Sequence, residues 1–255
     1  MLLAAQGLTK RFGGVAALSD VDFELDAGEV VALVGDNGAG KSTLIKAIAG
    51  IQPGEEGTYL FDGQEVTIHT PQDATRLGIA TVYQDLALAD NLDVVANLFL
   101  GAELHTHGSD RLTGTLDEPE MELRTREVLR TLSIGTLRNV RARVGQLSGG
   151  QRQAVAIARS LLGAPRLVIL DEPTAALGVA ETAEVLTLIH RLRERGLGVI
   201  VISHNLDTVF DVADRIVVLR LGRRVATFDR EQTSREAVVA SILGLEPAVD
   251  VAVSA

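Results

Sequence analysis

One stretch of this 255-residue chain indicates its fold: Glu29-Val-Val-Ala-Leu-Val-Gly35-Asp-Asn-Gly-Ala-Gly40-Lys41-Ser42-Thr43. An apolar run typical of a buried strand is followed by the pattern Gly-x-x-x-x-Gly-Lys-Ser and then by a helical pattern that ends at Gly50. This order of strand, glycine-rich loop and helix is the context of a phosphate-binding loop. We therefore expect a nucleotide to contact Gly35, Asp36, Asn37, Gly38, Ala39, Gly40, Lys41, Ser42 and Thr43.

The chemistry of the loop supports this expectation. Its glycines allow the backbone to curl so that successive N–H groups point at a phosphate, and the N-terminus of the following helix adds partial positive charge. Lys41 supplies a full charge for the β- and γ-phosphates, and the Ser42 hydroxyl is a ligand for Mg²⁺. The alternative is a glycine-rich turn that only caps a helix, and the flanking strand and helix disfavour it.

Apolar runs of the same kind recur along the chain and alternate with helical patterns. Such runs, without strict alternation and set between helices, are typical of buried parallel strands, so we expect an α/β fold with a mostly parallel sheet. The runs are 29–34, 79–83, 167–170, 199–202 and 215–219. Two pieces differ, because Val21–Leu25 alternates strictly and Gly57–Asp62 leads into an Asp-Gly turn; both predict antiparallel strands.

The segment from about Asp85 to Val144 contains no strand-like run. It contains helical patterns near 93–100 and 119–132, so we interpret it as a helical insertion into the sheet core. The last residues, 246–255, match no element and are expected to form a loose tail.

Composition excludes several other classes of protein. There are 24 Lys and Arg against 34 Asp and Glu, a net charge of −10, and this argues against nucleic acid as the main partner. The chain has no cysteine, which excludes disulfides and cysteine chemistry. Its apolar runs are far shorter than the ~18 residues of a membrane span, and its N-terminus does not resemble a secretory signal. We expect a soluble protein of a reducing compartment.

Two further patterns complete a candidate site. The apolar run Leu167–Leu170 ends in Asp171 and Glu172, and carboxylates at the C-terminal end of a parallel strand lie where such sheets bind ligands. We expect Asp171 to hold Mg²⁺ and Glu172 to polarise the attacking water. Between these patterns, Ser148-Gly149-Gly150-Gln151 opens a helix over 151–162, with Ser148 as its N-cap. The two glycines are poor helix formers, and close approach of an anion is one reason for their presence.

Taken together, these patterns resemble an ATP-binding-cassette (ABC) ATPase over residues 3–245. Leu147-Ser-Gly-Gly-Gln151 matches the signature of that family without a change. Gln84 in Val82-Tyr-Gln-Asp matches its glutamine loop, and His204 in Val201-Ile-Ser-His matches its switch histidine. Phe12 stands where the family places an aromatic ring against adenine.

The resemblance implies a P-loop NTPase (RecA-like) core with an antiparallel β subdomain, formed by residues 1–84 and 151–245, and an inserted α-helical subdomain of residues 85–150. Residues 1–245 would form one ATP-binding domain with ATP and Mg²⁺ as ligands. The resemblance also implies that Gln84 helps to hold Mg²⁺, and that Gln84 and His204 lie near the γ-phosphate. In a head-to-tail dimer, Ser148, Gly149, Gly150 and Gln151 of one copy would close over ATP bound to the other.

Within the family, this sequence resembles the single-cassette branch of importers of simple sugars (ribose and fructose type). The matching stretches are 80–88, 97–101, 171–178 and 217–224. This implies docking on separate multi-span permease subunits at the cytoplasmic face of the membrane, through the groove around Gln84–Leu100, and an external sugar-binding protein. One departure is Gly178, where most cassettes have an Asp that helps to couple the two ATP sites.

Three alternatives remain open at this stage. The first is a non-transport ABC ATPase acting on ribosomes or DNA, which the acidic charge and single cassette disfavour. The second is an ATP-binding regulator without turnover, which the presence of Glu172 and His204 disfavours. The third is an exporter of lipids or drugs; exporters often fuse cassette and membrane segments in one chain, so a free-standing cassette favours import. The identity of the sugar is not encoded in this chain's motifs.

Overall fold

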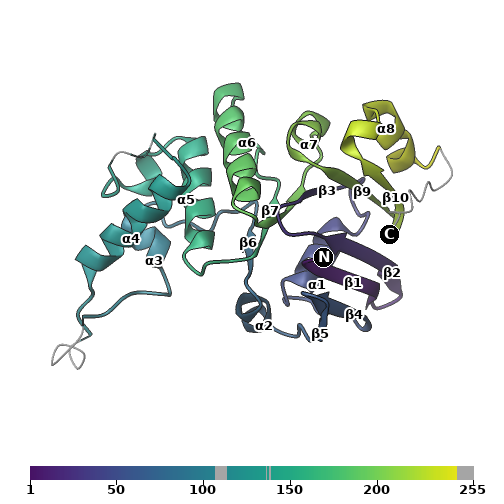
Figure 1. Cartoon of the computed structure of the whole chain (residues 1–255), viewed down its shortest axis with the longest axis horizontal. Coiled ribbons are helices and arrows are strands. Elements are labelled where there is room, and N and C mark those ends of the chain that lie inside the picture. Colours follow the sequence, from purple (N-terminus) through teal and green to yellow (C-terminus); the bar gives the residue numbers. More distant parts are fainter. Residues whose placement is uncertain (107–113, 136, 138, 246–255) are drawn as a thin grey trace.

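A six-stranded sheet with the order β10-β9-β3-β8-β7-β6 runs through the centre of the molecule (Figure 1). In the computed structural model, which describes residues 1–106, 114–135, 137 and 139–245, the neighbours β9, β3, β8, β7 and β6 pair in parallel and β10 pairs antiparallel to β9. The strands are β3 (Val30–Val34), β6 (Ile79–Val82), β7 (Leu167–Asp171), β8 (Gly198–Ile202), β9 (Arg215–Arg220) and β10 (Arg223–Asp229). The five predicted runs are confirmed to within one residue at each end, and the mostly parallel sheet is confirmed.

A second sheet is antiparallel and four-stranded, with the order β2-β1-β4-β5. Its strands are β1 (Leu3–Phe12), β2 (Val15–Leu25), β4 (Glu56–Phe61) and β5 (Gln64–Val66). This confirms antiparallel strands at 21–25 and 57–62, although β4 ends one residue before the predicted end. The Asp62-Gly63 turn joins β4 to β5, and both of its residues have positive φ.

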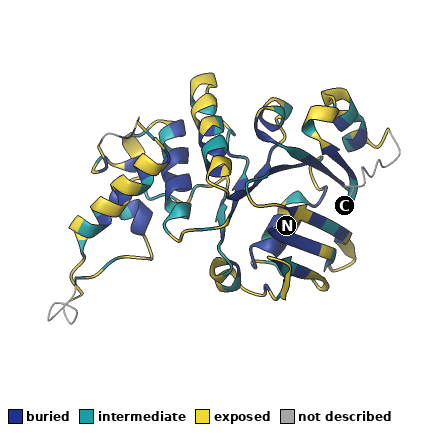
Figure 2. Cartoon of the chain, viewed as in Figure 1, coloured by how far each residue is buried: buried dark blue, intermediate teal, exposed yellow. Residues whose placement is uncertain are grey.

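Alternating side chains place the central sheet between two apolar layers. Val31 and Leu33 of β3 pack with the antiparallel sheet, whereas Val30 packs with the helical side on the opposite face. The same alternation occurs in β7 and β8, where every side chain from Leu167 to Leu170 and from Val199 to Ile202 is buried. Figure 2 shows these strands as a buried band with helices on one side, whose outer faces are exposed, and the antiparallel sheet on the other.

Eight α-helices are present in the described part of the chain. They are α1 (Lys41–Ile48), α2 (Pro71–Arg76), α3 (Val94–Phe99), α4 (Glu118–Thr131), α5 (Gly149–Leu161), α6 (Val179–Glu194), α7 (Leu206–Val212) and α8 (Arg235–Leu243). The helices α3, α4 and α5 gather at one end of the molecule (Figure 1), and α3 and α4 correspond to the helical patterns expected near 93–100 and 119–132. Within 85–144, the described residues contain only isolated β-bridges and no strand.

Two expectations concern the ends of elements. The predicted helix at 151–162 in fact begins at Gly149, so this prediction was wrong by two residues. The predicted tail, 246–255, lies outside the described residues. In the part of the chain that the structure describes, no helix combines the length and the hydropathy that a membrane span requires.

Candidate nucleotide-binding site

The phosphate loop connects β3 to α1, and its glycines are required by its geometry. Gly35 and Gly40 have φ of 148° and 106°, values that residues with a side chain rarely adopt. A Cβ at Gly35 would lie 2.2 Å from the carbonyl oxygen of Leu219, and one at Gly40 would lie 2.7 Å from that of Ala17. The loop is therefore packed tightly against β9 and β2, and α1 begins immediately after it at Lys41.

The Lys41 side chain folds back over the loop. Its Nζ donates hydrogen bonds to the carbonyl oxygens of Gly35 at 2.6 Å and of Asp36 at 3.0 Å. Burial lowers the pKa of Lys41, and the negative charges of Glu172, Asp36 and Asp171 oppose this shift. The ammonium group is thus held at the mouth of the loop by weak acceptors that an anionic ligand can replace.

A pocket of about 390 Å³ lies over the phosphate loop and brings together most of the predicted site residues. Its lining comes from β1, β2, the phosphate loop, α1, the segment after β6, and the ends of β7 and β8. The predicted residues in this lining are Phe12, Asn37, Gly38, Ala39, Gly40, Lys41, Ser42, Thr43, Gln84, Asp171 and Glu172. Gly35 and Asp36 contribute through their carbonyl contacts to Lys41. The pocket lining does not include residues 148–151.

Phe12 lies at the end of β1 with 47 % of its surface exposed, and its ring faces the pocket region. The Lys10 ammonium lies 5.6 Å from the centre of that ring. An exposed aromatic ring at the rim of a phosphate site provides a flat surface for a base to stack on.

Asp171 and Glu172 lie together where β7 ends. Burial raises the pKa of Asp171, and the neighbouring charge of Glu172 raises it further. The positive charges of Lys41 and Lys46 act in the opposite direction. Glu172 has a left-handed φ of 49°, and its backbone N–H donates to the carbonyl of Ile202 at 2.9 Å. This turn directs the Glu172 carboxylate toward the loop that follows β8.

The contact between Glu172 and His204 was not evident from the sequence. Nδ1 of His204 lies 2.8 Å from Oε1 of Glu172, and the backbone N–H of His204 donates to the same oxygen at 3.1 Å. A second bridge joins the same two segments, because the hydroxyls of Thr174 and Thr208 lie 3.1 Å apart. No spacing rule relates residues after β7 to residues after β8, so only the parallel pairing of these strands explains the contacts.

Ser148 caps α5 as predicted. Its Oγ accepts a hydrogen bond from the backbone N–H of Gln151 at 3.3 Å, and the Gln151 side chain accepts one from the backbone N–H of Ser148 at 3.0 Å. This reciprocal capping box explains why the helix includes both glycines. Residues 148–151 lie at the start of α5 and were expected to act on a second copy of the chain.

The structure gives the two glycines an intramolecular role. A Cβ at Gly149 would lie 2.8 Å from Cδ2 of Leu177, and one at Gly150 would lie 3.0 Å from Cβ of Glu181. Oε2 of Glu181 accepts a hydrogen bond from the backbone N–H of Gly178 at 3.2 Å. The backbone N–H of Gly178, the Ser148 hydroxyl and the N–H groups of Gly150 and Gly149 lower the pKa of Glu181. The glycines thus allow the start of α6 to pack directly on the start of α5.

Sequence reasoning missed Glu181, although a signal was present. Glu181 is the third residue of α6, and it accepts a hydrogen bond from the residue that caps this helix. A helix-capping residue followed three positions later by Glu is a recognised pattern at helix starts.

The donor set fits a magnesium ion bound together with phosphates. A hydroxyl from Ser42, an amide from Gln84 and a carboxylate from Asp171 line the same pocket. Among the described residues, no group of three or more His, Cys, Asp or Glu side chains could hold a metal ion by itself. Mg²⁺ commonly binds through one or two protein oxygens, with phosphate and water as its other ligands.

Comparison with known proteins agrees with this geometry. Residues 18–175 match the family model described as ABC transporter. The chain is 45% identical over 244 residues to the fructose import ATP-binding protein FrcA of Rhizobium meliloti, covering 95% of this chain and 94% of FrcA. It is 43% identical to the xylose/arabinose import ATP-binding protein XylG of Sulfolobus acidocaldarius, covering 93% and 92%.

A solved structure shows the same fold. It is the dimeric, post-hydrolysis state of an ATP-binding cassette with ADP and Pi bound. Its TM-score to this chain is 0.73 and its sequence identity is 26%, and the match covers 90% of this chain and 99% of that chain. The family match, the identity to FrcA and the shared fold lead to one conclusion: this chain belongs to the ABC transporter family and is an ATPase.

Proposed function

We propose that this chain is the energy-coupling ATPase subunit of an importer of a simple sugar. The observation that carries the proposal is the pocket in which Lys41, Asp171 and Glu172 line one space with the phosphate loop. The similarity to FrcA and XylG, which are named for fructose and for xylose or arabinose, supports a simple sugar as the cargo. Because the names of these relatives include three different sugars, they leave the particular sugar open.

The phosphate loop and its neighbours bind the nucleotide. In this proposal adenine stacks on Phe12, and the loop N–H groups and the N-terminus of α1 hold the phosphates. Lys41 exchanges its two carbonyl partners for oxygens of the β- and γ-phosphates. Ser42, Gln84 and Asp171 would hold Mg²⁺, which supplies neutralisation of phosphate charge when it is bound.

Glu172 and His204 act on the attacking water. Glu172 accepts a hydrogen bond from that water and orients its oxygen toward the γ-phosphorus. The water oxygen bonds to the γ-phosphorus and gives one proton to Glu172 while the bond to the β–γ bridging oxygen breaks, which yields ADP and phosphate. The backbone N–H of His204 holds the Glu172 carboxylate in place, and Nδ1 of the His204 imidazole contacts the same carboxylate.

The proposed dimer rests on the membership in the ABC family and on the dimeric cassette among the similar structures. In this proposal residues 148–151, which do not line the pocket of their own chain, close over the ATP bound to a second copy. Such a two-fold assembly contains two equivalent sites. ATP would favour the closed dimer and hydrolysis would release it, which is a ligand-driven population shift. Gly178, in place of the usual Asp, lies at the N-cap of α6 beside residues 148–150.

A permease subunit is the proposed membrane partner, at the cytoplasmic face. A groove of about 360 Å³ lies between α1, α2, β6 and the end of α5, and its lining includes Ile51, Ala74, Tyr83 and Pro165. We expected docking around Gln84–Leu100. The groove begins beside that segment, at Tyr83, and a helix of the permease would lie along it. We also propose that residues 85–150 move as a subdomain against the rest of residues 1–245.

The proposal is tested with the purified chain and its transport complex. The chain should release phosphate from MgATP, and reconstitution with its permease and binding protein should accelerate this release when one simple sugar is added. Absence of phosphate release would contradict the ATPase assignment, and stimulation by no simple sugar would contradict sugar import. A non-transport role on ribosomes or DNA is disfavoured by the net charge of −10 and by the importer relatives.

A further inference from the structure

Arg159 joins the signature helix α5 to the segment that follows Gln84. Its Nη1 donates to the carbonyl oxygen of Ala87 and its Nη2 to that of Leu86, each at 2.7 Å. A forked guanidinium suits two consecutive carbonyls because it presents parallel donors in a fixed plane. Burial lowers the pKa of this half-buried side chain, and both of its hydrogen-bond partners among the described residues are carbonyl oxygens. Arg159 therefore binds the backbone carbonyls of residues 86–87, and among the described residues it does not form an ion pair.

The same segment is held farther along by residues just before the signature. The backbone N–H of Gly145 donates to the carbonyl of Asp90 at 3.0 Å, and that of Val144 donates to the carbonyl of Leu92 at 2.9 Å. A Cβ at Gly145 would lie 3.1 Å from the Asp90 oxygen, so the two backbones are close. Residues 86–92 are thus attached to both sides of residues 147–151.

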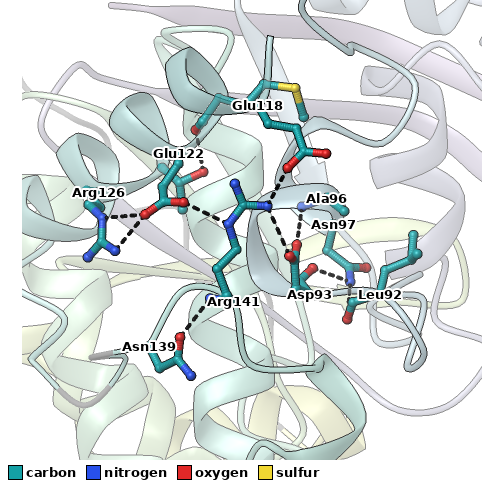
Figure 3. Close-up of polar contacts among 11 residues, drawn as sticks. Leu92, Asp93, Ala96, Asn97, Glu118, Glu122, Arg126, Asn139 and Arg141 are labelled. Atoms are coloured by element: carbon teal, nitrogen blue, oxygen red, sulfur yellow. Dashed lines mark hydrogen bonds and ion pairs between the residues drawn. The ribbon is translucent and has the colours of Figure 1, made fainter. Parts of the chain in front are cut away.

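Buried and charged contacts make the surrounding helices one unit (Figure 3). The Asn97 side chain is fully buried and bonds the backbones of Ala89, Leu92 and Asp93. The Arg141 guanidinium reaches Asp93 at the start of α3, and both Glu118 and Glu122 of α4. The network thus joins α3, α4 and the loop before the signature.

These contacts locate one connection between the central sheet and the group of helices α3, α4 and α5. β6, within the central sheet, ends at Val82, and the Arg159 contacts begin at Leu86. Only Tyr83–Asp85 lie between them, and Gln84 is the middle residue of this short connection. α5 extends from Arg159 back to Ser148 over about 16 Å, at 1.5 Å per residue, as a continuous helix.

We propose that Arg159 is a positioning residue that transmits displacement of the Gln84 segment to the signature residues at the other end of α5. The proposal rests on the proposed roles of Gln84 and Ser148 under "Proposed function". If bound nucleotide attracts Gln84, Leu86 and Ala87 move with it. The two charge-assisted hydrogen bonds from Arg159 then move α5 in the same direction. Without the fork, Gln84 could still approach the nucleotide, but only the backbone contacts of Gly145 and Val144 would connect its segment to the signature, and Ser148 would be placed less exactly over the second site.

A matched pair of variants tests this inference. Arg159→Gln removes both bonds to Leu86 and Ala87, whereas Arg191→Gln removes bonds of the same chemistry to the consecutive carbonyls of Leu132 and Ser133, away from the Gln84 segment. We expect Arg159→Gln to bind MgATP within about 2-fold of the parent affinity but to lose about 10-fold or more in kcat. Arg191→Gln should stay within about 2-fold in both. Equal kcat values for the two variants would overturn the proposal.

A distance measurement provides a readout that lowered stability alone would not change. Because the chain has no cysteine, Ala87→Cys and Gln146→Cys give a specific pair of spin-label sites. The distance between them should remain narrow in the parent with and without MgATP, and should broaden in Arg159→Gln but not in Arg191→Gln. An unchanged distance in Arg159→Gln would contradict the inference.

Arg159→Lys keeps the charge and the long stem but loses the fork, so it serves if the glutamine variant folds poorly. Its kcat should stay well below that of the parent, because a single ammonium group cannot reproduce both bonds to Leu86 and Ala87, and a kcat equal to that of the parent would count against the fork. Failure of the proposed function would look different, because the parent chain itself would then not hydrolyse MgATP.

Discussion

The carboxylate of Glu172 lies 2.8 Å from Nδ1 of His204 and also accepts the backbone N–H of His204 at 3.1 Å. Glu172 ends one parallel strand and His204 follows the next, so the pairing of β7 with β8 creates the contact. The carboxylate of Glu172, which we propose orients the attacking water, therefore has a position defined by the protein itself. Such preorganisation removes part of the cost of placing the attacking water.

Glu172→Gln should separate binding from turnover. The amide oxygen still accepts the backbone N–H of His204, so the local structure and nucleotide binding should persist. The amide is a much weaker base for water, and kcat should fall by a factor on the order of 100 or more. Phosphate release and an ATP-binding titration measure the two effects. Glu65→Gln, on the exposed strand β5, is the control, and normal turnover in Glu172→Gln would show that another group activates water.

Lys41→Ala should lose nucleotide affinity. Removing a charged donor to phosphate costs about 1.5–3 kcal/mol, or roughly a 10- to 100-fold rise in Kd. The control is Arg76→Ala in α2, because this exposed cation does not line the pocket. Equilibrium binding of MgATP provides the comparison. Equal affinity for the Lys41 variant and the parent would refute the assignment of the phosphate loop.

Gly150→Ala should destabilise the fold, since the new Cβ would lie 3.0 Å from Cβ of Glu181 and 3.3 Å from its Cα. Overpacking of this kind costs about 1–3 kcal/mol. Gly163→Ala is a suitable control, because a Cβ there meets nothing within 4 Å and the backbone φ is not positive. Urea unfolding of both variants measures the difference. A Gly150→Ala chain as stable as Gly163→Ala would mean that α6 can shift without cost.

Asp171→Asn should stabilise the nucleotide-free chain at pH 8. Burial and the charge of Glu172 raise the pKa of Asp171, so its ionised form carries a cost that increases as pH rises through that pKa and is relieved as pH falls. Asparagine removes this cost, so the melting temperature of the variant should exceed that of the parent at pH 8, and the difference should shrink as pH falls through the raised pKa of Asp171 toward the ordinary carboxyl pKa. Melting curves across this range, without Mg²⁺, test the sign. A difference in melting temperature that increases toward low pH would contradict burial and the charge of Glu172 as the causes of the raised pKa.

The parts of the site that were predicted from sequence depend on local patterns. The phosphate loop was predictable because Gly35, Gly40 and Lys41 follow a buried run directly. Asp171 and Glu172 were predictable because a short apolar run ends at them. In both cases the residues that decide the geometry are neighbours in the chain.

The parts that were not predicted depend on pairings between distant residues. Arg159 meets Ala87 across 72 positions, and no local pattern marks either residue. The start of α5 was placed two residues late because two glycines are poor helix formers in isolation. The Ser148 capping box and the packing of Glu181 outweigh that preference. Strand β10 was not predicted because it begins with two charged residues, Arg223 and Arg224, so that its apolar run is too short to indicate a strand.

The most direct test of the central claim is a crystal structure of the Glu172→Gln variant with MgATP. The account predicts a two-fold dimer in which each γ-phosphate lies between Lys41 and Asp171 of one copy and Ser148 of the other. A nucleotide bound outside the phosphate-loop pocket, or a dimer in which Ser148 faces away from ATP, would contradict it.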